Sequence, residues 1–361
     1  MISSRNKSGV KITNGLVAGA FRQRMYQTRI IITVSFFANP SNADHNIGSQ
    51  SFLDGMHQSP GFIKPLVDQI SMTSEIRRLR KEDQALVDEL CAGIWSGNDY
   101  VPNRFSQWVE DEDTIVLGTL DDDKLIAIIA MVPISRGGVT WAKGLRVHED
   151  YREEGKATEI VEHLVDTAQD EGYARMWYAT SSRNKASMHV AEKVGFELTE
   201  QVGYFRLDAP FPKRPKPSPT IKPLRIDPRR LHKMAKETGL FQGSKIPVSW
   251  EFEMPTLQGL RRLNEETDFY IIVNDHGSIE AMYFTEDVSR NGSERVAVTI
   301  FALDRGIFID TVARLLEESE RHELDQIAFF LGPNATEWSE TMLIIPKKYE
   351  GRRFVLYERE L

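Results

Sequence analysis

From residue 75 onward, apolar residues recur along the chain with two different spacings. Short apolar, β-branched runs predict strands over residues 75–80, 114–120, 124–132, 139–148, 174–180 and 202–207. Apolar positions at helical spacing predict helices over residues 83–94, 154–171 and 184–194. The three aspartates at positions 121–123 are a turn signal, so we expect the second and third strands to form a hairpin.

The second half of the chain repeats much of this order. The same patterns predict strands over residues 269–273, 279–284, 295–303, 326–331 and 353–360, and a helix over residues 308–322. Apart from a second helix, which the pattern does not locate here, the order is that of residues 115–207. We therefore expect an internal structural repeat. The alternative is that two unrelated domains with strands and helices look alike at this level of detail.

A proline-rich segment separates the two halves. Residues 209–219 contain five prolines. Because proline lacks a backbone N–H and has a fixed φ, this segment is neither a helix nor the interior of a sheet, and it is typical of an extended linker. A chain of 361 residues is also long for one hydrophobic core. We expect one domain over residues 72–208, a linker over 209–220 and a second domain over 221–361.

The first 71 residues differ from the rest. Up to Ala43 they contain six basic residues and no acidic one, a composition typical of organelle transit peptides. We expect residues 1–71 to be a disordered tail, or an extension upstream of a true start at Met72, with a transit peptide as the alternative. We expect a cytoplasmic protein, or a mitochondrial one if this segment is a transit peptide.

Composition excludes several classes of protein. The formal net charge of −8 argues against nucleic-acid binding, which needs clustered Lys and Arg. No apolar run reaches the ~20 residues of a membrane span. The single cysteine, Cys91, cannot form an intramolecular disulfide, and no Cys/His cluster has zinc spacing, so no metal site is expected. The sequence does not indicate an oligomeric state.

The segment that points to chemistry is residues 144–158. A strand ends there, a short loop follows, and a long helix begins at a turn of small residues. The first N–H groups of a helix lack intrahelical partners and lie at the positive end of its dipole, so they bind anions such as a pyrophosphate. Gly155 and Ala157 leave room for phosphates, and Arg152 supplies a charged donor.

Arg152-x-x-Gly155-x-Ala157 resembles the R/Q-x-x-G-x-G/A signature of the GNAT superfamily, which binds the pyrophosphate of acetyl-CoA. At the expected distance, residues 184–187 and 192–196 resemble the family's N-x-x-A and E-K-x-G-F elements, with Ser187 in place of the alanine. The resemblance covers residues 75–207. It implies an α/β (α+β) fold with a central mixed sheet flanked by helices, followed here by a second, degenerate GNAT-like domain.

The resemblance also implies residue roles for acetyl-CoA as co-substrate. Main-chain N–H groups of the strand before the turn, Val147 foremost, would hold the thioester carbonyl, and an asparagine, here Asn184, would contact the pantetheine arm. The residues expected to bind acetyl-CoA are Leu145, Arg146, Val147, Arg152, Glu153, Glu154, Gly155, Lys156, Ala157, Thr158 and Asn184. Two departures stand out: Glu154 occupies a position that is often basic, and Ala191 occupies that of the tyrosine often used as general acid.

A closer resemblance is to the vertebrate histidine N-acetyltransferase family. It depends on a G-x-D-Y-x-P segment at residues 97–102 and on Gly144-Leu145-Arg146-Val147, with Lys143 where that family has glutamate. It implies acetylation of the α-amine of free histidine, a small-molecule amine. Asp99 and Tyr100 are then expected in the substrate site, where an aspartate can hold a cationic group. A carboxylate on the acceptor calls for an arginine, for which Arg104 and Arg136 are candidates.

Acid and base roles are less marked in the sequence. The attacking amine must lose a proton, and the base candidates are Glu149, Asp99, His148 and His189. Tyr204, near the start of the last strand of the first half, is the candidate that protonates the departing thiolate, while a half-buried structural tyrosine is the alternative.

We expect an N-acetyltransferase, an enzyme of the acyltransferase class. The alternatives are an acetyltransferase acting on protein or peptide amines, and a non-catalytic GNAT module that binds CoA. The second half has Asp304-Arg305-Gly306-Ile307-Phe308 where the phosphate turn would lie. Its bulky residues predict no acetyl-CoA site there and a role in covering the acceptor pocket.

Overall fold

The computed structural model describes residues 74–94, 99–134, 138–290 and 292–361. The predicted extension of residues 1–71 and the candidate Arg136 lie outside these residues. Below, "first half" means residues 74–208 and "second half" means residues 224–361. The chain between them, residues 209–223, contains neither helix nor strand, as its prolines predict; the domain boundary placed there stays a prediction.

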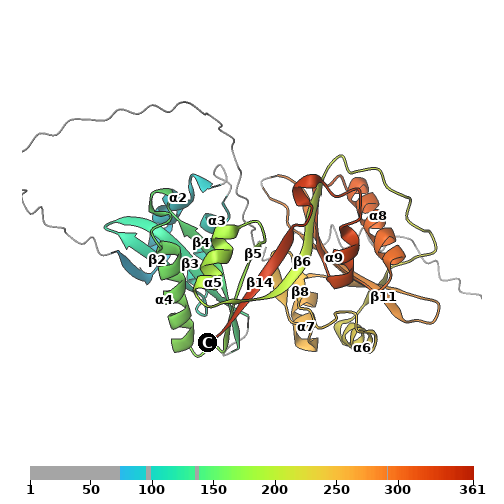
Figure 1. Cartoon of the computed structure of the whole chain (residues 1–361), viewed down its shortest axis with the longest axis horizontal. Coiled ribbons are helices and arrows are strands. Elements are labelled where there is room, and N and C mark those ends of the chain that lie inside the picture. Colours follow the sequence, from blue (N-terminus) through green and yellow to red (C-terminus); the bar gives the residue numbers. More distant parts are fainter. Residues whose placement is uncertain (1–73, 95–98, 135–137, 291) are drawn as a thin grey trace, which may run out of the picture.

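The first half has the elements that its pattern predicts, together with the additional helix α3 (Figure 1). They are β1 (Glu75–Arg78), η1 (Lys81–Asp83), α2 (Gln84–Cys91), α3 (Val101–Glu110), β2 (Ile115–Asp121), β3 (Lys124–Pro133), β4 (Val139–Val147), η3 (Glu149–Tyr151), α4 (Lys156–Asp170), β5 (Arg175–Ser181), α5 (Lys185–Lys193) and β6 (Glu197–Asp208). Pro102 lies in the first turn of α3, where its missing N–H costs no hydrogen bond.

The second half repeats this order. It contains β7 (Leu224–Ile226), α6 (Pro228–Thr238), β8 (Ile246–Val248), β9 (Glu251–Glu253), α7 (Leu257–Glu266), β10 (Phe269–Val273), β11 (Ile279–Asp287), β12 (Arg295–Ala302), α8 (Arg305–Arg321), β13 (Gln326–Leu331), α9 (Pro333–Ser339), η4 (Lys347–Tyr349) and β14 (Arg353–Glu360). The second helix of the repeat, which the sequence pattern did not locate, is α9; the pattern also did not predict β7, α6 and α7. The β8–β9 hairpin is an addition without a counterpart in the first half.

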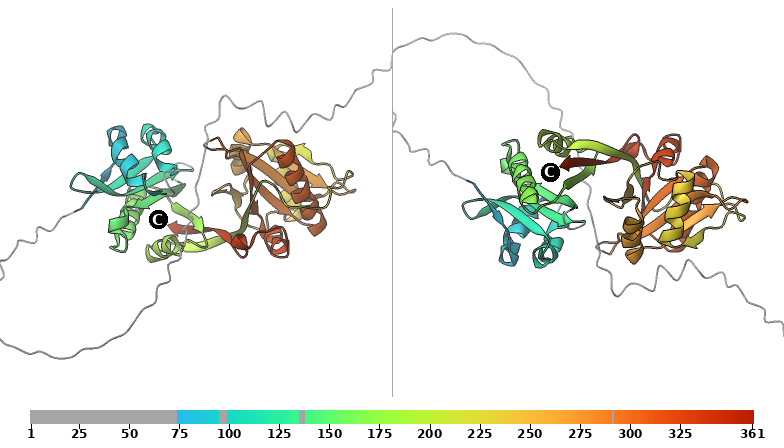
Figure 2. Two further views of the ribbon diagram at one scale, coloured as in Figure 1. Left: turned by 90° about the horizontal axis from the view of Figure 1, so that it is seen from above. Right: turned by 90° about the horizontal axis from the view of Figure 1, so that it is seen from below.

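The last strands of the two halves are exchanged. The strand order of the main sheet is β1-β2-β3-β4-β5-β14-β6-β13-β12-β11-β10-β7. The C-terminal strand β14 therefore lies between β5 and β6, and β6 lies between β14 and β13. Figure 2 shows the halves as two lobes bridged by these strands. From sequence order alone, residues 202–207 would pair within the first half and residues 353–360 within the second. In the structure each of these strands pairs with strands of the other half.

Helices cover both faces of the sheet. In the first half, α4 and α5 pack on one face and α2 and α3 on the other, each over its own buried apolar cluster. In the second half, α6 and α7 cover one face and α8 and α9 the other. The side chains that the pattern of α4 predicts to be buried are buried: Ile160, Val161, Leu164, Val165 and Ala168. Within the described residues, no helix combines the length and apolar character needed to span a bilayer.

Candidate functional site

Two neighbouring strands of the first half diverge at the centre of the sheet. Strand β4 pairs in parallel with β5 over four residue pairs, the last of which joins Ala142 and Tyr178. Beyond that pair the strands separate, although β4 continues to Val147 and β5 to Ser181. No described strand fills the gap beside this part of β4. We call this gap the splay.

A bulge in β4 accompanies the divergence. The pairing of β4 with β3 shifts register between Ile128 and Ala130, opposite Gly144. Gly144 has a φ of +70°, and a Cβ there would lie 2.9 Å from the Trp108 ring, so only glycine fits. The bulge thus turns the end of β4 away from β5.

Beyond the bulge, alternate N–H groups of β4 point into the splay. The His148 N–H donates to the carbonyl of Ile126 in β3 at 2.8 Å. Because N–H groups alternate along a strand, the N–H of Val147 points to the opposite edge, toward the splay. This is the orientation that a donor to a thioester carbonyl would need.

The predicted phosphate turn follows β4 directly. Gly155 has a φ of +83° and open space around the position of a Cβ. It precedes α4, and no side chain caps the N-terminus of that helix. Glu153 also has a positive φ, of 68°, a conformation that costs a non-glycine residue free energy and is common at functional sites. The turn is exposed from Arg152 to Gly155, so an anion can reach the helix end.

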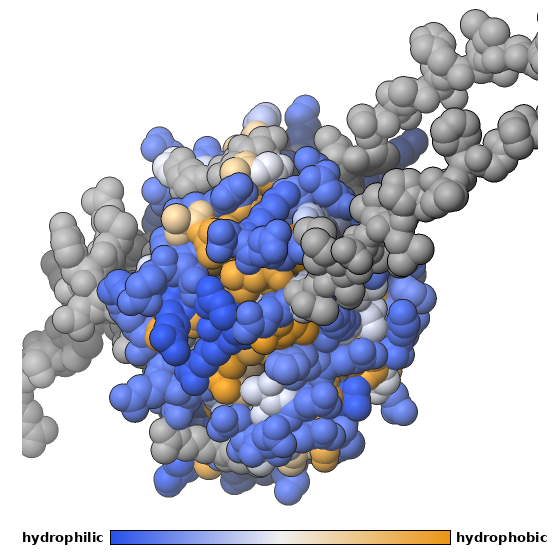
Figure 3. Space-filling model, turned by 90° about the vertical axis from the view of Figure 1, so that its left-hand side faces the viewer, coloured by the Kyte–Doolittle hydropathy of each residue, from blue (hydrophilic) through white to orange (hydrophobic). Residues whose placement is uncertain are grey.

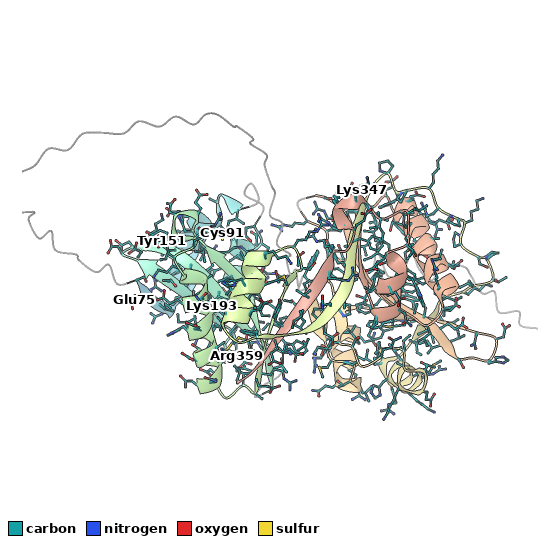
Figure 4. All side chains as sticks on the ribbon, in the orientation of Figure 1. Glu75, Cys91, Tyr151, Lys193, Lys347 and Arg359 are labelled. Carbon is teal, nitrogen blue, oxygen red and sulfur yellow. The ribbon has the colours of Figure 1, made fainter. Side chains whose placement is uncertain are left out.

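The remaining residues of the turn differ in exposure. The Lys156 ammonium donates to Ser74 Oγ at 2.6 Å and to Glu159 at 3.0 Å. Thr158 is buried, whereas Glu154 is exposed. Tyr151, just before the turn, lies at the end of the molecule away from the second half (Figure 4). Figure 3 shows that end, where apolar surface is visible between polar side chains.

Asn184 presents a donor without a partner. Its Oδ1 accepts the backbone N–H of Ser187 at 3.2 Å and so caps α5. Its Nδ2 is buried and has no hydrogen-bond partner. A buried donor left unsatisfied costs about 1–3 kcal/mol, so this atom fits a ligand that accepts a hydrogen bond there. Ser187 itself bonds the Tyr178 hydroxyl at 2.7 Å.

The structure assigns Asp99 a partner within the protein. Its two carboxylate oxygens accept hydrogen bonds from Arg146 Nε and Nη2, at 2.6 and 2.8 Å, and both side chains are buried. The Arg146 guanidinium also lies over the Tyr100 ring, 5.2 Å from its centroid. Burial disfavours the charge of Arg146, but the hydrogen bonds with Asp99 leave its pKa above the usual value. The sequence leads us to expect Asp99 to hold a cationic group of the acceptor, but in the structure its carboxylate is paired with Arg146 instead.

Tyr204 lies in an aromatic cluster that the two halves share. Its ring contacts Trp250 at 4.5 Å and Phe330 at 5.1 Å between centroids, and Arg352 lies over it at 5.3 Å. The side chain is buried, and its hydroxyl has no hydrogen-bond partner. Burial raises the pKa of this phenol far above its usual value, so Tyr204 keeps its proton at neutral pH.

The base candidates from the sequence are placed less favourably. Glu149 and His189 are exposed. His148 Nδ1 accepts the backbone N–H of Asp150 at 3.3 Å, and Asp99 is bound by Arg146. Among the described residues, none of these side chains forms a hydrogen bond or ion pair with β5 or β14.

Sequence reasoning missed residues of the second half. The turn of the β8–β9 hairpin reaches the splay: Glu251 forms an ion pair with Lys143 of β4, and the Trp250 ring contacts Phe354 of β14 at 5.7 Å. Phe354 pairs with Ser181 at the end of β5. The hairpin therefore contacts β4 on one side of the splay and β14, the neighbour of β5, on the other. No local sequence signal links residue 143 to residue 251.

The second half lacks the corresponding gap. Its parallel strands β12 and β13 stay paired over six residue pairs, from Arg295–Gln326 to Ile300–Leu331. Asp304 Oδ1 caps α8 by accepting the Ile307 N–H at 2.8 Å, and Phe308 in the first turn is buried. In the described residues of the second half, the two parallel strands therefore leave no gap between them, and a side chain caps the N-terminus of the helix that follows.

A polar cleft of about 780 Å³ lies elsewhere, near the C-terminal ends of α4 and α5. Lys193 and Arg359 line it (Figure 4). None of the predicted site residues does. Among the described residues, no group of three or more His, Cys, Asp or Glu side chains is arranged to hold a metal ion.

Comparisons with known proteins agree with this geometry. Residues 77–196 match the model of the acetyltransferase (GNAT) family. The chain is similar to a GCN5-related N-acetyltransferase from Sphaerobacter thermophilus, with 13% identity over 80% of this chain and 95% of that one, at a TM-score of 0.53. It is similar also to a tandem GNAT protein from the clavulanic acid biosynthesis pathway, with 12% identity over 80% of this chain and 98% of that one, at a TM-score of 0.51.

No curated protein sequence matches the chain. The family match lies within the first half, and the solved structures show the predicted fold class, a large mixed sheet flanked by helices. The tandem GNAT structure fits a second domain of the same kind. None of these matches supports histidine as the acceptor.

Proposed function

We propose that the protein is an acetyl-CoA-dependent N-acetyltransferase that acetylates the primary amine of a small molecule, with the α-amine of L-histidine as the first acceptor to test. The observation that carries the proposal is the splay between β4 and β5, which leads to the uncapped N-terminus of α4. This combination offers an extended ligand a strand edge at one end and an anion site at the other.

The described residues fit acetyl-CoA along this path. The turn of residues 152–158 would receive the pyrophosphate on backbone N–H groups, with Arg152 as a charged donor. Asn184 Nδ2, which is buried without a partner, would donate to an amide carbonyl of the pantetheine arm. The edge of β4 at Leu145–Val147 would run beside that arm, and the N–H of Val147 would meet the thioester carbonyl, where one donor is typically worth about 3–4 kcal/mol to catalysis. Acetyl-CoA supplies the activated acyl group.

Four further residues shape the acceptor side. Arg146, fixed by Asp99, holds the bulged end of β4 in place and packs on Tyr100. Tyr204 keeps its proton and has no acceptor in the protein, which suits the proposed role of donating that proton to the leaving thiolate.

A small acceptor is favoured over a peptide because the second half covers the splay. The ion pair of Lys143 with Glu251 and the contact of Trp250 with Phe354 place the β8–β9 hairpin against its mouth. An acceptor with a carboxylate is favoured by Arg104, whose Nη2 is buried without a hydrogen-bond partner while its Nη1 bonds Gln107. Free histidine has both a primary amine and a carboxylate.

The second half is proposed to bind no acetyl-CoA. Its paired β12 and β13 and the self-capped, Phe308-filled start of α8 support this. One molecule of acetyl-CoA per chain in a calorimetric titration is the expected result, and two would contradict it.

The test of the function is release of thiol from acetyl-CoA by the full chain, with free amino acids, histamine, polyamines and short peptides as acceptors. Turnover selective for L-histidine would support the proposal in full. Turnover with other small amines would keep the reaction and change the acceptor. Turnover with peptides alone would favour a protein acetyltransferase, and acetyl-CoA binding without turnover would favour a non-catalytic module.

A further inference from the structure

The β8–β9 hairpin carries a buried serine to the mouth of the splay. Ser249 lies in the hairpin turn directly before Trp250 and Glu251, which contact β14 and β4. It is 4% exposed and has a φ of +50°. A serine in that conformation is uncommon and is maintained only where its surroundings fix it. The hairpin turn is therefore a defined part of this junction.

Ser249 holds a carboxylate of the second half. Its hydroxyl donates to Glu286 Oε2 at 2.6 Å, and Glu286 lies near the end of β11. Among the described residues Glu286 forms no ion pair. The charged groups that act on it are the carboxylates of Glu251 on β9 and Glu266 on α7.

The surroundings of Glu286 raise its pKa above that of a glutamate in water. Burial raises its pKa to about 7; the bond from Ser249 opposes the rise, and the charges of Glu251 and Glu266 add to it. A carboxylate of this pKa accepts a proton readily at neutral pH, whereas an ordinary glutamate is a much weaker base. A half-buried carboxyl that forms no ion pair is also a favourable partner for an ammonium group.

The same two acidic residues connect Glu286 with the acceptor side of the first half. Glu251 and Glu266 act electrostatically on Arg104 of α3 as well as on Glu286. Arg104 and Glu286 are therefore both within electrostatic range of the same two carboxylates. A zwitterionic acceptor carries a carboxylate that could bind Arg104 and an ammonium group that could bind Glu286.

We propose that Glu286 is the proton acceptor for the attacking amine, supplied to the splay of the first half by the second half. This inference rests on the proposed function. The acceptor arrives as an ammonium ion, and Glu286 takes one proton from it. The neutral amine then forms the C–N bond as the C–S bond breaks. The second proton leaves the nitrogen as the thiolate is protonated, and Glu286 returns its proton to solvent, so that one acetylated amine, one CoA thiol and one proton are formed.

The experiment compares Glu286→Gln with wild type and with Glu280→Gln, all in the full chain. Glu280 is a half-buried glutamate at the other end of β11, so it controls for the loss of a charge on that strand. Acetyl-CoA binding is measured by calorimetry, and kcat/KM is measured from pH 5.5 to 9 with the fastest acceptor of the panel. Binding of that acceptor to the CoA-bound protein is measured over the same range.

We expect Glu286→Gln to bind acetyl-CoA like wild type and to lose at least 100-fold in kcat/KM at pH 7. The wild-type profile should rise through an inflection near pH 7 that the variant lacks, and acceptor binding should weaken in the variant. Ser249→Ala removes a bond that lowers the pKa of Glu286, so it should move the inflection to higher pH. Glu280→Gln should resemble wild type throughout.

Two outcomes would overturn the inference in different ways. If Glu286→Gln binds acetyl-CoA and keeps the wild-type rate and pH profile, Glu286 is not the proton acceptor, while the proposed function stands. If the wild type itself binds no acetyl-CoA, the proposed function fails and this inference fails with it.

Discussion

Val355 and Leu356 are neighbours in β14, yet they are buried in the cores of different halves. Val355 belongs to the apolar cluster under α4 and α5, and Leu356 to the cluster shared with α8 and α9. Both are fully buried. Because successive side chains of a strand point to opposite faces, one strand at the junction seals a core on each side.

The exchange of strands predicts that the halves unfold together. Val355→Ala should cost about 2 kcal/mol and Leu356→Ala about 3 kcal/mol in the free energy of unfolding, from lost burial and residual cavities. Each variant should shift one common transition in denaturant, monitored by tryptophan fluorescence and by circular dichroism. Two separate transitions, with each substitution moving a different one, would show that the halves are independent.

A substitution in the phosphate turn should weaken acetyl-CoA binding more than its effect on the stability of the fold explains. Gly155→Ala places a side chain at φ +83°, with open space around the Cβ, so the fold should lose only about 1–2 kcal/mol. The methyl group would occupy the approach of the pyrophosphate, and acetyl-CoA binding should weaken at least 10-fold in calorimetry.

Gly172→Ala is the matched control for that variant. Gly172 lies beyond the other end of α4, has a φ of +76° and also has open space around it. It should lose similar stability and bind acetyl-CoA like wild type. Equal binding losses in the two variants would mean that backbone strain, and not contact with phosphate, weakens binding.

A feature can be predicted from the sequence when the residues that determine it lie close together in the chain. Hairpin β2–β3 and helix α4 follow from turn residues and apolar spacing within a few turns of chain, so these elements were predicted well. Asn184 was identified by resemblance, but its unpartnered Nδ2 is a property of the fold. Pairing of β14 with β5 joins residues about 180 positions apart, and no periodicity within either strand selects that partner.

In the candidate site, too, some residues are neighbours in the chain and others are brought together only by the fold. Gly155 and Arg152 lie in one turn and are recognisable together. The sequence leads us to expect a cationic group of the acceptor at Asp99, whereas in the structure Asp99 pairs with Arg146, 47 residues away. Glu286 is connected to the junction through Ser249, which lies in the β8–β9 hairpin. The two strands of that hairpin have three residues each and are too short for a clear sequence pattern.

One substitution of Asn184 separates its capping of α5 from its proposed contact with acetyl-CoA. Asn184→Asp keeps an oxygen to cap α5 through the Ser187 N–H and removes the Nδ2 donor. We expect the midpoint of thermal unfolding to stay within 2 °C of wild type and the Kd for acetyl-CoA to rise roughly 10-fold, since one hydrogen bond to a ligand is worth about 1 kcal/mol and the new carboxylate repels phosphate. Unchanged affinity would exclude a contact of Nδ2 with acetyl-CoA.

Tyr204→Phe tests the proposed proton donor. The hydroxyl is buried without a partner, so its removal should leave stability unchanged or raise it. If the phenol protonates the thiolate, kcat should fall roughly 100-fold while the Kd for acetyl-CoA stays constant. Tyr283→Phe removes the hydroxyl of another buried tyrosine, on β11, and should leave kcat near wild type. A wild-type kcat in Tyr204→Phe would leave Tyr204 a purely structural residue.

Arg104 predicts a preference for acceptors that carry a carboxylate. Its Nη2 is buried without a partner, and burial lowers its pKa from a value so high that the guanidinium stays charged at neutral pH. Arg104→Gln should raise KM for L-histidine roughly 10-fold, since a charge-assisted hydrogen bond is worth about 1.5–3 kcal/mol. It should leave KM for histamine unchanged, because histamine has the same imidazole and a primary amine but no carboxylate. Equal effects on the two acceptors would place the carboxylate site elsewhere and leave Arg104 as a support for α3 through Gln107.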